Sequence, residues 1–177
     1  MSLPEAPRGA LRRVLDALYD GAAWLAALFM VGLLAMVWLS ILGRQLHFHV
    51  PGTDAYAGYL MAAAGFLALA HTLKRGEHIR VTLLLARLRG RARRALELWS
   101  IGASALLALL LAFYSVRLVW LSHRFHDVST ASDATPLWLP QIGMALGCVV
   151  FALALVDEWV LALRGSSGIA AQATRHE

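Results

Sequence analysis

Four long stretches of the chain carry few charged residues, and each is long enough to cross a lipid bilayer as a helix. They run from Gly21 to Gly43, from Ala55 to Leu73, from Leu98 to about Leu121, and from about Pro136 to about Leu163. A transmembrane helix needs about 20 mostly apolar residues. The pattern therefore predicts an all-α integral membrane fold with four transmembrane helices, built from residues 21–163.

The composition agrees with lipid as the solvent. Of the 177 residues, 59% are hydrophobic and 15% are charged, against roughly 45–50% and 25% in soluble domains. Cys148 is the single cysteine, so an internal disulfide is excluded and we interpret it as a packing residue. Four membrane spans also exclude a soluble nucleic-acid binder, although the net charge is +5.

The Lys and Arg residues between the spans predict the orientation of the chain. Arg44, Arg117 and Arg124 lie on one side of the predicted membrane, and all the others lie on the opposite side. Short loops rich in Lys and Arg stay in the cytoplasm. We therefore expect a multi-pass protein of the bacterial inner membrane, with residues 1–20 and 164–177 as cytoplasmic tails.

Half of all Lys and Arg residues lie in one connection, residues 73–97. Within it, "HIRVTLLLARL" is too short to span a bilayer, but it can lie flat with aliphatic side chains in lipid and arginines at head groups. We predict a short interfacial amphipathic helix near residues 78–89, bound to membrane lipids; the alternative is a solvated connecting helix. The residues predicted to form its turn and anchor are Gly76, His78, Ile79, Arg80 and Arg87.

The centres of the spans contain no residues suited to ion coupling or catalysis. Ionisable residues at membrane depth usually mark substrate and ion pathways, and none stands in the middle of a span. All seven histidines lie at span ends, in loops or in the C-terminal tail. We therefore predict no catalytic residue, no metal and no cofactor. A redox subunit with b-type haem and a stand-alone small transporter or channel remain the alternatives.

Small residues at helical spacing are the most specific feature of the spans. Gly58 with Ala62, and Gly143 with Gly147, are each four residues apart. Such pairs allow helices to approach closely in lipid. The sequence leaves open whether they pack within this chain or against another subunit.

Several motifs together resemble the DctQ-like small membrane subunit of tripartite ATP-independent periplasmic (TRAP) transporters. They are Gly43-Arg44 at the end of the first span, "VPGTDAYAGYL" before and within the second, "LKRGEHIRV" after it, and "TPLWLPQIGMALG" at the fourth. The resemblance covers roughly residues 19–163.

The resemblance implies a scaffold that does not carry solute itself. Its partners would be a large permease subunit, which holds the ion and substrate sites, and a periplasmic substrate-binding protein. The transported solute would be an organic acid, taken up with a cation gradient. Residues at the periplasmic ends of the helices are then candidates for contact with the binding protein: Arg44, Asp54, Arg124 and Asp127.

Overall fold

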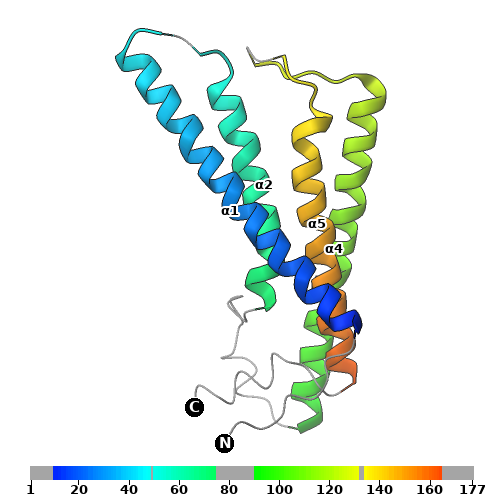
Figure 1. The fold of residues 1–177 in the computed structure, drawn as a ribbon. Coiled ribbons are helices and arrows are strands. Elements are labelled where there is room, and N and C mark those ends of the chain that lie inside the picture. The colour runs from blue at the N-terminus through cyan, green and yellow to red at the C-terminus, as the bar shows by residue number, and fades with distance from the viewer. Residues whose placement is uncertain (1–9, 49, 75–89, 132–133, 165–177) are drawn as a thin grey trace, which may run out of the picture.

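The computed structural model describes residues 10–48, 50–74, 90–131 and 134–164. Four helices account for most of them: α1 (Ala10–Gln45), α2 (Thr53–Lys74), α4 (Gly90–Phe125) and α5 (Trp138–Leu163) (Figure 1). All four are long and apolar enough to cross a membrane. The prediction of an all-α membrane fold with four spans is therefore confirmed. The predicted interfacial helix lies outside the described residues.

The helices form a row in the order α1, α2, α5, α4. Contacts are extensive between α1 and α2, between α2 and α5, and between α4 and α5, whereas α1 barely touches α5. Figure 1 shows α1 crossing in front of its neighbours at a steep tilt. Because the row does not close on itself, α2 and α5 are the central helices and α1 and α4 are the flanks.

Small side chains fill the contacts between the helices. Alanines make up most of the buried core, together with Leu67, Cys148 and Leu155. Apolar attraction does not drive helices together in lipid, so association depends on close van der Waals packing. Alanine and glycine permit that packing because they let the helix backbones approach.

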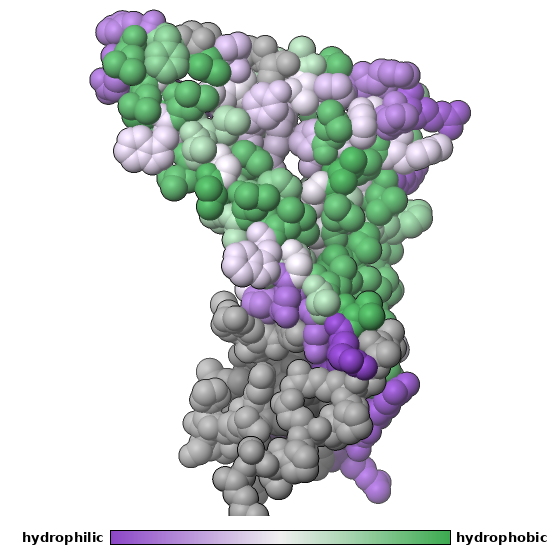
Figure 2. Space-filling model, viewed as in Figure 1, coloured by the Kyte–Doolittle hydropathy of each residue, from purple (hydrophilic) through white to green (hydrophobic). Residues whose placement is uncertain are grey.

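The outer surface of the row is strongly apolar. Large side chains such as Trp24 (79% exposed), Leu107 (67%) and Phe113 (63%) stand on the flanking helices α1 and α4. Figure 2 shows hydrophobic residues along the visible helices and hydrophilic residues gathered at their ends. Apolar surface of this extent fits a membrane environment rather than water.

Helices α1 and α4 extend well beyond the apolar stretches that predicted them. Each of α1 and α4 has 36 residues, or about 54 Å at a rise of 1.5 Å per residue. That exceeds a hydrocarbon core of about 30 Å. In α4 the extra length carries exposed Arg91, Arg93 and Arg94, so its first turns extend into the polar zone.

Pairs of tryptophans in α4 and α5 indicate where each helix meets the two membrane interfaces. Trp99 and Trp120 in α4 are 21 residues apart, as are Trp138 and Trp159 in α5, which corresponds to roughly 31 Å of helix. Tryptophan concentrates at both membrane interfaces. The spacing therefore matches one hydrocarbon thickness, with Trp120 and Trp138 at one interface and Trp99 and Trp159 at the other.

Candidate functional site

The buried Ser115 hydroxyl, between α4 and α5, is bonded within the chain. The Ser115 hydroxyl lies 2.7 Å from the Leu111 carbonyl oxygen and 3.3 Å from the Cys148 sulfur. A serine bonded back to its own helix in this way needs no further partner. Across residues 10–48, 50–74, 90–131 and 134–164, no group of three or more His, Cys, Asp or Glu residues could hold a metal ion.

The closest helix contact joins α5 to α2 through Gly143 and Gly147. A Cβ atom at Gly147 would lie 2.5 Å from the backbone carbon of Phe66, and one at Gly143 would lie 2.8 Å from the Ala63 Cβ. Real Cβ atoms do not approach so closely, so both positions require glycine at this helix separation. The structure thus places this glycine pair inside the chain's own helix row.

The second small-residue pair has a different environment. Gly58 is exposed, and a Cβ atom there would meet nothing within 4 Å. Ala62 is half-buried, one turn further along α2. A Cβ atom at Gly65 would likewise meet nothing within 4 Å. Gly58 and Gly65 therefore lie away from the α2–α5 contact.

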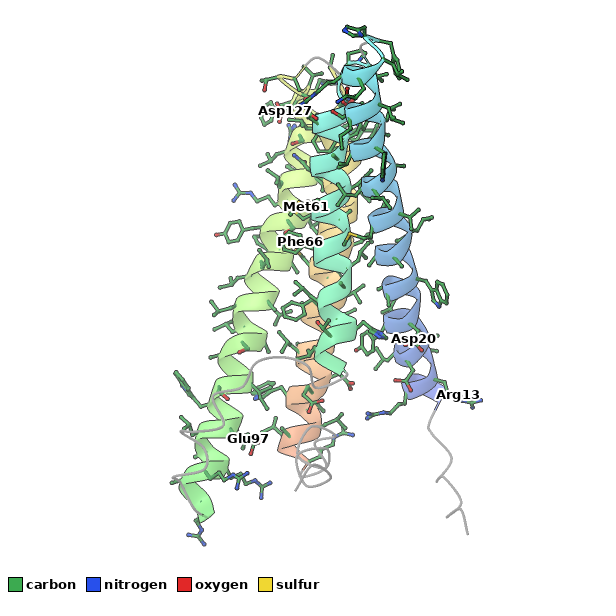
Figure 3. The ribbon with its side chains drawn as sticks, turned by 90° about the vertical axis from the view of Figure 1, so that its left-hand side faces the viewer. Arg13, Asp20, Met61, Phe66, Glu97 and Asp127 are labelled. Carbon is green, nitrogen blue, oxygen red and sulfur yellow. The ribbon has the colours of Figure 1, made fainter. Side chains whose placement is uncertain are left out.

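Charged residues of the described chain gather near the two ends of the row. Figure 3 shows Arg13, Asp20 and Glu97 at one end and Asp127 at the other. At the first end, the Asp20 carboxylate lies 3.7 Å from His71 Nδ1, which joins α1 to the last turns of α2. A Cβ atom at Gly102 would lie 3.0 Å from the Trp159 Nε1, so α4 and α5 also meet closely near this end.

At the second end, α1 and α2 are joined by a polar contact. Arg44 Nη2 lies 3.7 Å from Asp54 Oδ2, and the Ser40 hydroxyl donates a hydrogen bond to Asp54 Oδ1 at 3.2 Å. His47, with φ of 58°, follows the end of α1, and the Phe48 N–H bonds to the Gly43 carbonyl at 3.0 Å. This six-residue closure is a Schellman motif, which ends the helix with a left-handed residue.

The same motif ends α4, and the loop behind it is fixed to α2. His126 has φ of 55° and the Asp127 N–H bonds to the Ser122 carbonyl at 3.0 Å. Two hydrogen bonds then connect the loop to the start of α2: Tyr59 to Ser129 at 2.9 Å and Tyr56 to Thr135 at 2.8 Å. We call this pair of hydrogen bonds the tyrosine clasp.

Comparison with known protein families identifies the family of this chain. The family model for the DctQ component of tripartite ATP-independent periplasmic transporters matches residues 33–165, which is most of the chain. The chain belongs to the DctQ family. The resemblance predicted from its motifs is confirmed, and no curated protein matches the chain. This DctQ protein is thus a transporter component with a multi-pass membrane location.

The predicted binding-protein contacts of the DctQ protein occupy two separate places at one end of the row. Arg44 and Asp54 come together between α1 and α2. Arg124 instead stacks over the Trp120 ring, at 5.2 Å from its centroid. Asp127 begins the loop that the tyrosine clasp fixes. Gly76, His78, Ile79, Arg80 and Arg87, predicted for the interfacial helix, lie outside the described residues.

Sequence reasoning missed the tyrosine clasp of the DctQ protein. Tyr56 and Tyr59 are three residues apart, so they share one face of α2. The loop between α4 and α5 is rich in Ser and Thr, and hydroxyl groups are suited to bond with tyrosine. Only the order of the helices, with α5 beside α2, shows that these groups can meet.

Proposed function

We propose that this chain is the stationary small subunit of a TRAP uptake system, working with a large permease subunit and a periplasmic substrate-binding protein. In this system the permease carries the substrate and ion sites and moves the solute. The solute is an organic acid, and a cation gradient drives its uptake. This subunit enlarges the membrane anchor against which the permease moves.

The observation that carries this proposal is the closely packed, uncharged interior of the row. Transport of a charged solute requires polar or ionisable groups at membrane depth. Here α2 and α5 meet through Gly143 and Gly147 at a separation that leaves no room for a side chain. A contact of this kind supports a rigid body rather than a moving gate, because close-packed interiors do not deform continuously.

We further propose that both termini face the cytoplasm and that the protein resides in the bacterial inner membrane. The distribution of Lys and Arg supports this orientation. The end that carries Arg44, Asp54 and the tyrosine clasp then faces the periplasm, where the binding protein approaches. The interfacial helix near residues 78–89 would hold the cytoplasmic face at anionic head groups.

Reconstitution tests the proposal directly. The large permease is placed in proteoliposomes with or without this chain, and uptake of a labelled carboxylate is measured with binding protein and a sodium gradient. We expect uptake from the complete system and none from this chain alone. Two outcomes would refute the proposal: solute accumulation by the isolated chain, or full uptake by a permease that does not co-purify with it.

A further inference from the structure

The ends of α1 and α2 that carry Arg44 and Asp54 border a pocket to which the scaffold role assigns no ligand. Its volume is about 270 Å³, and its lining combines apolar Leu39 and Phe48 with polar Ser40, Arg44 and Asp54. It lies where α1 ends and α2 begins, at one end of the row and away from its centre. A mixed lining of this kind is typical of a site for an amphipathic ligand.

The pocket presents one positive and one negative group that are only partly satisfied by each other. The Arg44 guanidinium and the Asp54 carboxylate are 3.7 Å apart, with 77% and 80% of their side chains exposed. A strong charge-assisted hydrogen bond is shorter, at about 2.7–2.9 Å. The guanidinium carries five N–H donors and the carboxylate accepts several hydrogen bonds. Both groups therefore retain capacity for a ligand.

The depth of the pocket favours a lipid as the ligand. Trp38, 56% exposed, precedes Ser40 by less than one turn of α1, and exposed tryptophans mark the interface between head groups and acyl chains. Val37, Ile41 and Leu42 are exposed on the adjoining turns of α1. An acyl chain can follow that apolar surface while the head group remains in the pocket.

We propose that this pocket binds the head group of a zwitterionic phospholipid that carries a primary ammonium. The lipid phosphate contacts Arg44, and the ammonium contacts Asp54 and the Ser40 hydroxyl. A ligand with both charges satisfies both protein groups. An anionic head group would leave Asp54 facing a like charge, and a choline head group has no N–H to donate to a carboxylate.

The experiment measures which lipid the purified full chain retains. The protein is incubated with an equimolar mixture of phosphatidylethanolamine, phosphatidylcholine and phosphatidylglycerol of distinct masses, and native mass spectrometry counts the bound lipids. We expect a preference for phosphatidylethanolamine of about tenfold, the factor that one charge-assisted hydrogen bond can supply. Asp54→Asn should abolish that preference, and Arg44→Gln should weaken retention of all three lipids.

Two controls separate a lipid site from general charge effects and from a structural ion pair. Asp127→Asn makes the same charge change at the other periplasmic corner and should retain the wild-type preference. The exchange Arg44→Asp with Asp54→Arg restores an ion pair, but it reverses the order of charges relative to the head group. We expect this exchange to keep the thermal stability of the wild-type chain but to lose its lipid preference.

Three results would overturn the proposal. The first is equal retention of the three lipids by the wild-type chain. The second is an equal loss of preference in Asp127→Asn and Asp54→Asn. The third is displacement of the lipid by millimolar soluble phosphoethanolamine, which would make the ligand a free zwitterion. Because retention is measured without partner subunits, a negative result here leaves the transport experiment unaffected.

Discussion

Adding one methyl group at position 147 should separate the two central helices. In Gly147→Ala the new Cβ would lie 2.5 Å from the backbone carbon of Phe66, 2.7 Å from the Leu67 backbone nitrogen and 2.7 Å from the Phe66 Cβ. Favourable contacts between carbon atoms lie at about 3.5–4.0 Å. Two of the three neighbours are backbone atoms, which cannot rotate away. Relief therefore requires α5 to move from α2 by about 1 Å.

The expected cost follows from that displacement. Inserting one methyl group into a well-packed core destabilises proteins by about 1–3 kcal/mol. We place Gly147→Ala at the upper end, about 3 kcal/mol, because the obstacle is backbone. Gly143→Ala should cost less, about 1–2 kcal/mol, because its new Cβ would have one contact under 3 Å, to the Ala63 Cβ at 2.8 Å, whereas at Gly147 there are three. Adding Ala63→Gly to the Gly143→Ala variant should then recover part of the lost free energy of unfolding.

The measurement is the unfolding of the purified chain by SDS in mixed micelles, followed by tryptophan fluorescence and helical circular dichroism. Gly65→Ala is the matched control, since a Cβ atom there meets nothing within 4 Å. We expect it to change the free energy of unfolding by less than about 1 kcal/mol, the scale of helix propensity. The packing argument is refuted if Gly147→Ala and Gly65→Ala unfold at the same SDS fraction.

Three smaller predictions concern the ends of the row. Tyr59→Phe removes the hydrogen bond to Ser129 and should lower the opening free energy of the loop after α4 by about 1 kcal/mol. Amide hydrogen exchange in that loop should become faster; an unchanged exchange rate would show that the tyrosine clasp does not stabilise the loop. Asp20→Asn should lower the free energy of unfolding by less than about 1 kcal/mol, because its partner His71 is not fully buried. A larger decrease in that free energy, measured by SDS titration, would contradict this expectation. Replacing Arg87, Arg89, Arg91, Arg93 and Arg94 by glutamine should leave part of the population inverted, since each residue contributes about 1 kcal/mol near the surface. In intact cells, an impermeant thiol reagent should then label Arg164→Cys in the inverted molecules. Absence of any label would show that the remaining charges suffice to orient the chain.

The fold could be predicted from the sequence because its main signal is local. Apolar length alone predicts four spans, and each corresponds to one of the four helices, with α5 beginning two residues after the predicted start. The helix ends were less predictable. The first turns of α4 are charged, so they carry no apolar signal, although Arg and Ala are good helix formers.

The neighbours of each helix could not be predicted from the sequence. The spacing of Gly143 and Gly147 indicates close packing, but many helices could supply the opposite surface. The structure shows that α2 supplies it, through Ala63 and Phe66. The tyrosine clasp depends on the same arrangement, because Tyr59 and Ser129 are far apart in sequence. Long-range contacts of this kind follow from the order of the helices and not from any local pattern.

The order of the helices also bears on where a partner subunit can attach. The central helices α2 and α5 each have two extensive helix contacts, whereas α1 and α4 have one each. A partner that replaced lipid on a flank would gain packing area, because many Leu, Val, Phe and Trp side chains are exposed on α1 and α4. The α2–α5 contact would stay intact during such an attachment. The row can thus widen a membrane scaffold at its edges while its centre remains fixed, which is the mechanical property that the proposed role requires.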